Sequence, residues 1–157
     1  MELIATRPLI AGDLGDVVLR ASHEAWQVSR AGRELPAFSG FNLLHLPMSA
    51  LSCSVLVDVD GGAFTYGFCG PEMTRLSGID PRGCRIDSWS GSLTSHLQRA
   101  YGDVVATRSP LAEVVITRFG DTDVHKTVLR LPFAEHGGQV DSILIVATHQ
   151  RSSARAA

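Results

Sequence analysis

The stretch 64–86 constrains the fold of this chain more than any other, because its pattern changes abruptly from alternating to turn-rich. In its first part, the aromatic residues Phe64, Tyr66 and Phe68 alternate with non-aromatic residues. A period of two is typical of a β-strand, and it places the three rings on one face of that strand. The first part therefore predicts a strand with an aromatic face.

The second part of the same stretch predicts a short helical lid. Gly70 and Pro71 end the strand, because proline cannot donate to a sheet ladder whereas its fixed φ suits the first turn of a helix. A short helix follows and ends at Gly78, and Gly83 redirects the chain after the Asp80–Pro81 turn. A strand, a short helix and a second short element in this order can fold over one face of a sheet.

The composition indicates one folded domain and excludes several classes of partner. Of the 157 residues, 45% are hydrophobic, which suits a sizeable core. The net charge of −2 comes without a basic run, so we expect no nucleic-acid and no membrane partner. No apolar run approaches the ~20 residues that span a bilayer, and we expect no secretory signal. Cys53, Cys69 and Cys84 lack C-x-x-C spacing, which favours a reducing, cytoplasmic location.

An N-terminal helix is predicted over residues 14–31, with Asp13 as its cap. Its apolar stripe comprises Val18, Leu19, Ala21, Ala25, Trp26 and Val28. We expect Trp26 to anchor the helix on its own sheet. The alternative is that the helix pairs with its twin in a homodimer, and the width of the stripe leaves room for both contacts.

The rest of the chain completes an α+β pattern. Strands are predicted over 53–59, 112–119, 124–133 and 140–148, in addition to the aromatic strand, with a longer helix from Ser92 or Thr94 to about residue 108. Turn residues between the strands make them antiparallel, and helices grouped on one side give an α+β domain. We divide the chain into a lead (1–13), a helix and connection (14–51), a core (52–149) and a flexible tail (150–157).

The order of these motifs resembles the PAS family, in particular bacterial stand-alone PAS proteins. The matching residues of the central stretch are Phe64, Tyr66, Gly70, Leu76, Gly78 and Gly83. Outside that stretch, the matches are Trp26, Gly32, Arg33, Pro36 and the step Leu131-Pro132-Phe133. The resemblance spans about residues 15–148. It implies a five-stranded antiparallel sheet with helices on one face, an extra N-terminal helix, and a non-enzymatic sensory or signalling module that acts through dimerisation or a partner protein.

The resemblance and the strand alternation together place a pocket for a small apolar ligand between the sheet and the helices of residues 71–108. The expected lining residues are Phe68, Met73, Leu76, Ile86, Leu97, Tyr101, Val115, Leu131 and Ile145. A filled core with the same composition is the alternative, because apolar pockets and apolar cores use the same residues.

Catalytic and cofactor signals are weak in this sequence. No histidine pair has metal-binding spacing, and we expect His23 and the other histidines to be solvated or singly hydrogen-bonded. His96 is the candidate haem ligand, but it flanks the apolar stripe of its helix. Cys84 lacks the asparagine that precedes the reactive cysteine of flavin-binding PAS domains, so we expect neither haem nor flavin. An isomerase- or hydrolase-like enzyme is the alternative function, yet only Asp87 borders an apolar stripe.

Overall fold

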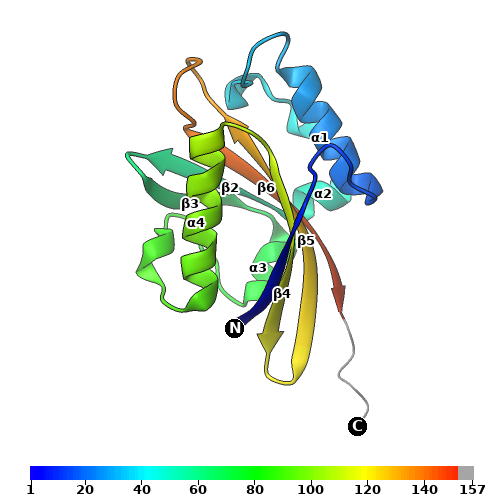
Figure 1. Cartoon of the computed structure of the whole chain (residues 1–157), viewed down its shortest axis with the longest axis vertical. Coiled ribbons are helices and arrows are strands. Elements are labelled where there is room, and N and C mark those ends of the chain that lie inside the picture. Colours follow the sequence, from blue (N-terminus) through cyan, green and yellow to red (C-terminus); the bar gives the residue numbers. More distant parts are fainter. Residues whose placement is uncertain (152–157) are drawn as a thin grey trace.

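Six antiparallel strands form the central sheet of the computed structural model, which describes residues 1–151 (Figure 1). The strands are β1 (Glu2–Leu9), β2 (Ser54–Asp60), β3 (Ala63–Cys69), β4 (Leu111–Phe119), β5 (Thr122–Phe133) and β6 (Ser142–Arg151). Their order across the sheet is β1-β4-β5-β6-β2-β3. The five strands predicted from the sequence are β2 to β6, and their antiparallel arrangement with helices confirms the α+β fold class.

Both ends of the described chain contribute more strand than the sequence predicts. The segment predicted as a lead contains β1, which pairs antiparallel with β4 from Glu2 opposite Arg118 to Leu9 opposite Ala112. Most of β1 is exposed and it contains Pro8, which edge strands tolerate, so no clear alternation marks it. At the other end, β6 continues through Arg151, into the segment predicted as a tail. Residues 152–157 of that predicted tail lie outside the described residues.

Four α-helices cover the two faces of the sheet. They are α1 (Val17–Ser29), α2 (Met48–Ser52), α3 (Pro71–Ser77) and α4 (Ser92–Thr107), with short 3-10 turns η1 (Phe38–Gly40), η2 (Leu43–His45) and η3 (Ile86–Ser88). Helix α4 contacts β4 and β5, whereas α1 contacts β5 and β6. Arg130 lies against Tyr101 of α4, and Phe133 lies against Phe38 and Phe41 of the segment that follows α1. Since residues 130 and 133 point to opposite faces of β5, α4 covers one face and the N-terminal segment covers the other.

Helix α1 is shorter than predicted and turned about its axis relative to the predicted stripe. It begins after Asp16, whose carboxylate accepts a hydrogen bond from the Leu19 N–H at 2.9 Å, so Asp16 and not Asp13 is the cap. Its buried residues are Leu19, Ser22, His23 and Trp26. Val28, predicted in the stripe, is 79% exposed. A hydrophobicity pattern does not indicate that polar residues such as Ser22 are buried, so it predicts a different buried face for this helix.

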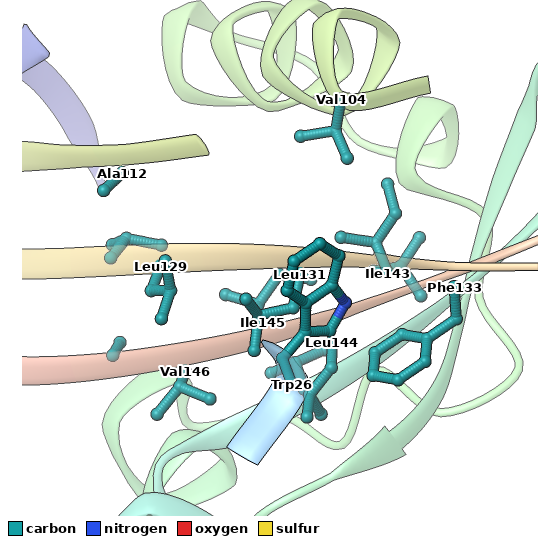
Figure 2. Packing of buried hydrophobic residues seen from close by; sticks show 14 of the residues in the cluster. Trp26, Val104, Ala112, Leu129, Leu131, Phe133, Ile143, Leu144, Ile145 and Val146 are labelled. Carbon is teal, nitrogen blue, oxygen red and sulfur yellow. The ribbon is translucent and has the colours of Figure 1, made fainter. Parts of the chain in front are cut away.

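His23 is a second correction on α1, because it is buried rather than solvated. Only 9% of it is exposed, and its ring stacks on Trp26 with 6.1 Å between the ring centroids. Burial lowers the pKa of His23, because an apolar environment disfavours the charged imidazolium. Trp26 behaves as predicted: it is 3% exposed, and its indole Nε1 donates to the Pro132 carbonyl oxygen at 2.7 Å. Figure 2 shows Trp26 beside the strands that carry Leu131 and Leu144.

A β-bulge in β3 overturns the prediction of three rings on one face. Val57 pairs with Tyr66, but Val55 pairs with Cys69, so β3 carries one more residue than β2 over this interval. Alternate side chains of β3 point towards the pocket up to Tyr66, and the next side chain that does so is Cys69. Phe68 is left 43% exposed.

The lid forms as the glycine and proline pattern predicts. Pro71 occupies the first turn of α3, and Gly78 ends the helix with a left-handed φ of 73°. Gly70 has a further role, because a Cβ there would overlap the carbonyl oxygens of Leu51 and Ser52. The close approach of Gly70 to the end of α2 places the start of α3 beside α2.

Candidate ligand-binding pocket

A pocket of about 440 Å³ lies between the sheet and helices α3 and α4. Met73 and Leu76 line it from α3, and Leu97 and Tyr101 line it from α4. Its floor consists of Val55 from β2 and of alternate residues of β4, β5 and β6, with Tyr66 and Cys69 from β3. Small-molecule sites typically have volumes of about 300–1,000 Å³, so the pocket is large enough for a modest organic ligand.

The structure brings six of the nine predicted lining residues together around this pocket. They are Met73, Leu76, Leu97, Tyr101, Val115 and Ile145. The strand residues among them, Val115 and Ile145, share a face of the sheet. Val115 lies opposite Lys126 and Ile145 lies opposite Arg130, and these two residues of β5 are an even number of positions apart. That these six residues contact a ligand stays a prediction.

Three predicted residues lie elsewhere. Phe68 points outward because of the bulge in β3. Leu131 is fully buried on the opposite face of β5, where it shares the side of Leu129 and Phe133. Ile86 is 1% exposed and belongs to the core beneath η3. The sequence therefore predicts the alternation of β5 correctly but places Leu131 on the wrong side of the sheet.

Sequence reasoning missed the polar wall of the pocket. Lys126 and Arg130 line it from β5, and Thr117 lines it from β4. A signal was present, because Lys126, Val128 and Arg130 follow a period of two on the face opposite the leucines. A basic residue on a strand is usually exposed, so the pattern alone did not indicate that these side chains face a covered side of the sheet.

A buried ion cluster lies behind this wall. Arg130 is 1% exposed, and its Nη1 lies 2.7 Å from Oε1 of Glu113. The same carboxylate oxygen lies 2.7 Å from Nε2 of His96 on α4. The Arg130 guanidinium also lies 5.6 Å from the Tyr101 ring centroid. Glu113 corrects the expectation that Asp87 is the only acidic residue near an apolar stripe, since Glu113 is buried near the start of β4.

Some polar atoms of the wall have no hydrogen-bond acceptor or donor within reach. Among residues 1–151, Nε of Arg130 and Oγ1 of Thr117 are buried without a hydrogen-bond partner. The ammonium of Lys126 forms neither an ion pair nor a hydrogen bond within the same residues. Burial lowers the pKa of Lys126, because the apolar surroundings disfavour its charged form. Such groups usually have partners in proteins, so this wall is unusual.

Two tyrosines complete the polar part of the lining. Burial raises the pKa of both Tyr66 and Tyr101 well above its usual range. Both phenols therefore stay neutral, and each can donate or accept a hydrogen bond in the pocket. The ring of Tyr66 also packs against Trp89, with 5.7 Å between the centroids.

The candidate haem ligand, His96, has another partner, because its Nε2 is engaged by Glu113. Cys84 is half-buried, and its carbonyl oxygen accepts a hydrogen bond from Tyr66 N–H. Within residues 1–151, no cluster of three His, Cys, Asp or Glu side chains is suited to hold a metal ion. The expectation that the protein binds neither haem nor flavin stays a prediction.

Comparison with known proteins gives little further information. No family model matches the chain, and no curated protein matches it. Among solved structures, one described as "Structure of an RNA-binding Light-Oxygen-Voltage Receptor" is similar, with 15% identity and a TM-score of 0.47 over 91% of this chain. The chain spans 37% of the length of that neighbour.

No helix within the described residues is long and apolar enough to cross a membrane.

Proposed function

We propose that this protein is a non-enzymatic sensory module of the PAS type, which binds a small molecule between the sheet and helices α3 and α4. The pocket of about 440 Å³ carries this proposal, because it lies where the family resemblance places a ligand. Its lining joins a lid helix, through Met73 and Leu76, to the sheet, through Val115 and Ile145. A ligand that contacts both parts would favour one position of the lid over others.

The enzyme alternative is less well supported by the same geometry. General acid–base catalysis needs an acid or base that can reach the substrate with a free lone pair or proton. The buried carboxylate of Glu113 is engaged by both Arg130 and His96. This arrangement suits a structural ion cluster better than a base.

The output of the module, in this proposal, passes through a homodimer formed by α1. Val17 is 68% exposed and Val28 is 79% exposed. Three turns of a helix take about 11 residues, so these two valines lie on one face of α1. That face points away from Trp26, which already anchors the helix on the sheet. A second copy would cover both valines through an isologous contact.

Ligand binding is tested by native mass spectrometry of the purified protein, followed by thermal unfolding with a panel of metabolites. Leu97→Trp should fill the pocket and abolish binding, whereas Arg99→Trp places the same ring on the exposed side of α4. A ligand retained by the Leu97→Trp protein would place the binding site elsewhere. If no molecule co-purifies and none of the panel raises the midpoint of unfolding, the sensory proposal fails.

Dimerisation is tested separately by light scattering of the full chain at tens of micromolar. The double change Val17→Asp and Val28→Asp should yield monomers. Leu44→Asp is the matched control, because Leu44 is 82% exposed on η2, outside α1. A monomeric wild-type protein would reject the dimer, and a doubly substituted protein that remains dimeric would remove α1 from the interface.

A further inference from the structure

The pocket combines an apolar body with a cationic wall at one side. Met73, Leu76 and Leu97 supply the apolar surface from the helices, opposite the sheet. Lys126 and Arg130 lie on the same face of β5, separated by Val128. Lys126 is the only lysine in the sequence, so its position in a covered pocket sets it apart from the basic residues of the surface.

The charges of this wall do not balance. Arg130 contributes one positive charge, and Glu113 contributes one negative charge that Arg130 shares with His96. Lys126 contributes a further positive charge without an ion pair in residues 1–151. Burial lowers the pKa of Lys126 because apolar surroundings solvate an ammonium poorly, and an anion beside it would remove that penalty.

The unsatisfied groups of the wall are suited to an acceptor. Nε–H of Arg130 and the ammonium of Lys126 are donors only, and the Thr117 hydroxyl can donate as well. Arg130 and Thr117 are 1% and 2% exposed, and both line the pocket. Nε of Arg130 and Oγ1 of Thr117 have no hydrogen-bond partner within residues 1–151. Thr117 lies two residues along β4 from Val115, the residue opposite Lys126, whereas Arg130 lies opposite Leu111, about 20 Å along the sheet from Thr117. A carboxylate has two acceptor oxygens and no donor, and it forms the strongest hydrogen bonds with charged donors.

We propose that the ligand of this pocket is an amphipathic carboxylate, which directs its head to Lys126 and Thr117 and its apolar body to α3 and α4. This inference rests on the proposed ligand-binding function and names the class of ligand. It replaces the purely apolar ligand expected from the sequence. A medium-chain fatty acid is a simple member of the class and serves as the probe.

The test compares decanoate with decanol by isothermal titration calorimetry on the full chain, below the concentration at which either probe aggregates. Decanoate should bind at least about tenfold more tightly, which corresponds to one charge-assisted hydrogen bond. Lys126→Met should remove this preference, because it should weaken the binding of decanoate much more than that of decanol. Arg99→Met removes one positive charge from the exposed side of α4 and should change neither affinity.

A second measurement needs no variant. Because the chain has a single lysine, an amine-reactive reagent followed by peptide mass spectrometry reports on Lys126 alone among its side chains. Decanoate should slow the labelling of Lys126, and decanol at the same concentration should slow it much less.

The outcomes separate the two proposals. If decanol binds as tightly as decanoate, the anionic head group is wrong, but ligand binding in the pocket stands. A different result would place the carboxylate away from this wall. In that case the wild type prefers decanoate, Lys126→Met keeps the preference, and decanoate does not slow the labelling of Lys126 in the wild type. Failure of both probes to bind would overturn the carboxylate class and count against the proposed ligand-binding function as well.

Discussion

The two faces of the sheet are covered by helices, but they are built differently. On the side of α1, Leu129, Leu131 and Phe133 of β5 are fully buried, and Trp26 closes over the strands (Figure 2). On the side of α4, alternate residues of the same strand include Lys126 and Arg130, and a pocket remains. One strand thus provides a close-packed core with its odd residues and a polar pocket wall with its even residues.

This difference assigns separate tasks to the two faces. A close-packed apolar face stabilises the fold, because every side chain keeps its van der Waals contacts and little volume is empty. A face with a cavity and buried charges forgoes part of that stabilisation. We therefore expect substitutions near α1 to act mainly on stability. Substitutions in the lining beneath α4 should divide into those that break the ion cluster and those that alter only binding.

The largest effect is expected on the α1 face. Trp26→Ala should lower the free energy of unfolding by about 3–5 kcal/mol, the range of buried aromatic truncations, and it also leaves the Pro132 carbonyl without its donor. Val28→Ala on the exposed side of the same helix should cost less than about 0.5 kcal/mol. Urea denaturation measures both. Equal effects of the two changes would show that α1 does not anchor the fold.

A smaller but still substantial loss is expected from the ion cluster on the α4 face. Arg130→Met leaves the buried Glu113 carboxylate without its closest cation, which should cost about 3 kcal/mol. Adding Glu113→Gln removes the uncompensated charge and should restore more than half of the loss in urea denaturation. If the double variant is as unstable as the sum of two single losses, the cluster does not act as a coupled pair.

Lys126→Met should raise stability when no ligand is added, in contrast to both changes above. The pKa of Lys126 is lowered on folding from its ordinary value of 10.5, so the folded state releases the proton more readily than the unfolded state. The buried charge of Lys126 therefore destabilises the folded state at neutral pH. This destabilisation disappears as the pH rises through the lowered pKa towards 10.5, because Lys126 then becomes neutral in both states. Thermal unfolding should show a more stable variant at neutral pH and a shrinking difference at alkaline pH. A constant difference would mean that Lys126 keeps its ordinary pKa.

The smallest effect is expected at the bulge. Phe68→Ser should change the free energy of unfolding by less than about 0.5 kcal/mol, because the ring is already outside the core. Phe64→Ala, on the same strand, removes an edge contact with Tyr101 at 5.6 Å between the centroids and should cost about 2 kcal/mol. The opposite ranking in urea denaturation would contradict the bulge and restore Phe68 to the pocket face.

Much of the candidate site could be predicted, but its chemistry could not. Apolar residues at helical or strand spacing, such as Leu97 and Ile145, are recognised because their period is local. Glu113 gave no signal of that kind, since its burial depends on partners that approach from β5 and α4. The same holds for Lys126, whose neighbours across the sheet are Val115 and His149.

The sequence by itself determined the strands β2 to β6, the lid helix α3 and the turns between them. Gly61–Gly62 provides the positive φ values that the β2–β3 hairpin requires, and Gly78 provides the one that ends α3. Period-two alternation also determined which residues of β5 share a face. These are properties of neighbouring residues, so they can be recognised without knowledge of the rest of the molecule.

Only the tertiary structure decided which face of β5 meets the pocket. Alternation assigns residues to two faces but does not say what covers each of them, and here helices cover both. The sequence places Leu131 in the pocket lining, whereas α1 and its following segment cover the face of β5 that carries Leu131 and leave Arg130 to face α4. The tertiary structure also decided two further features. The pairing of β1 with β4 depends on a strand distant in the sequence, and the bulge at Phe68 depends on a one-residue mismatch between β3 and its partner β2.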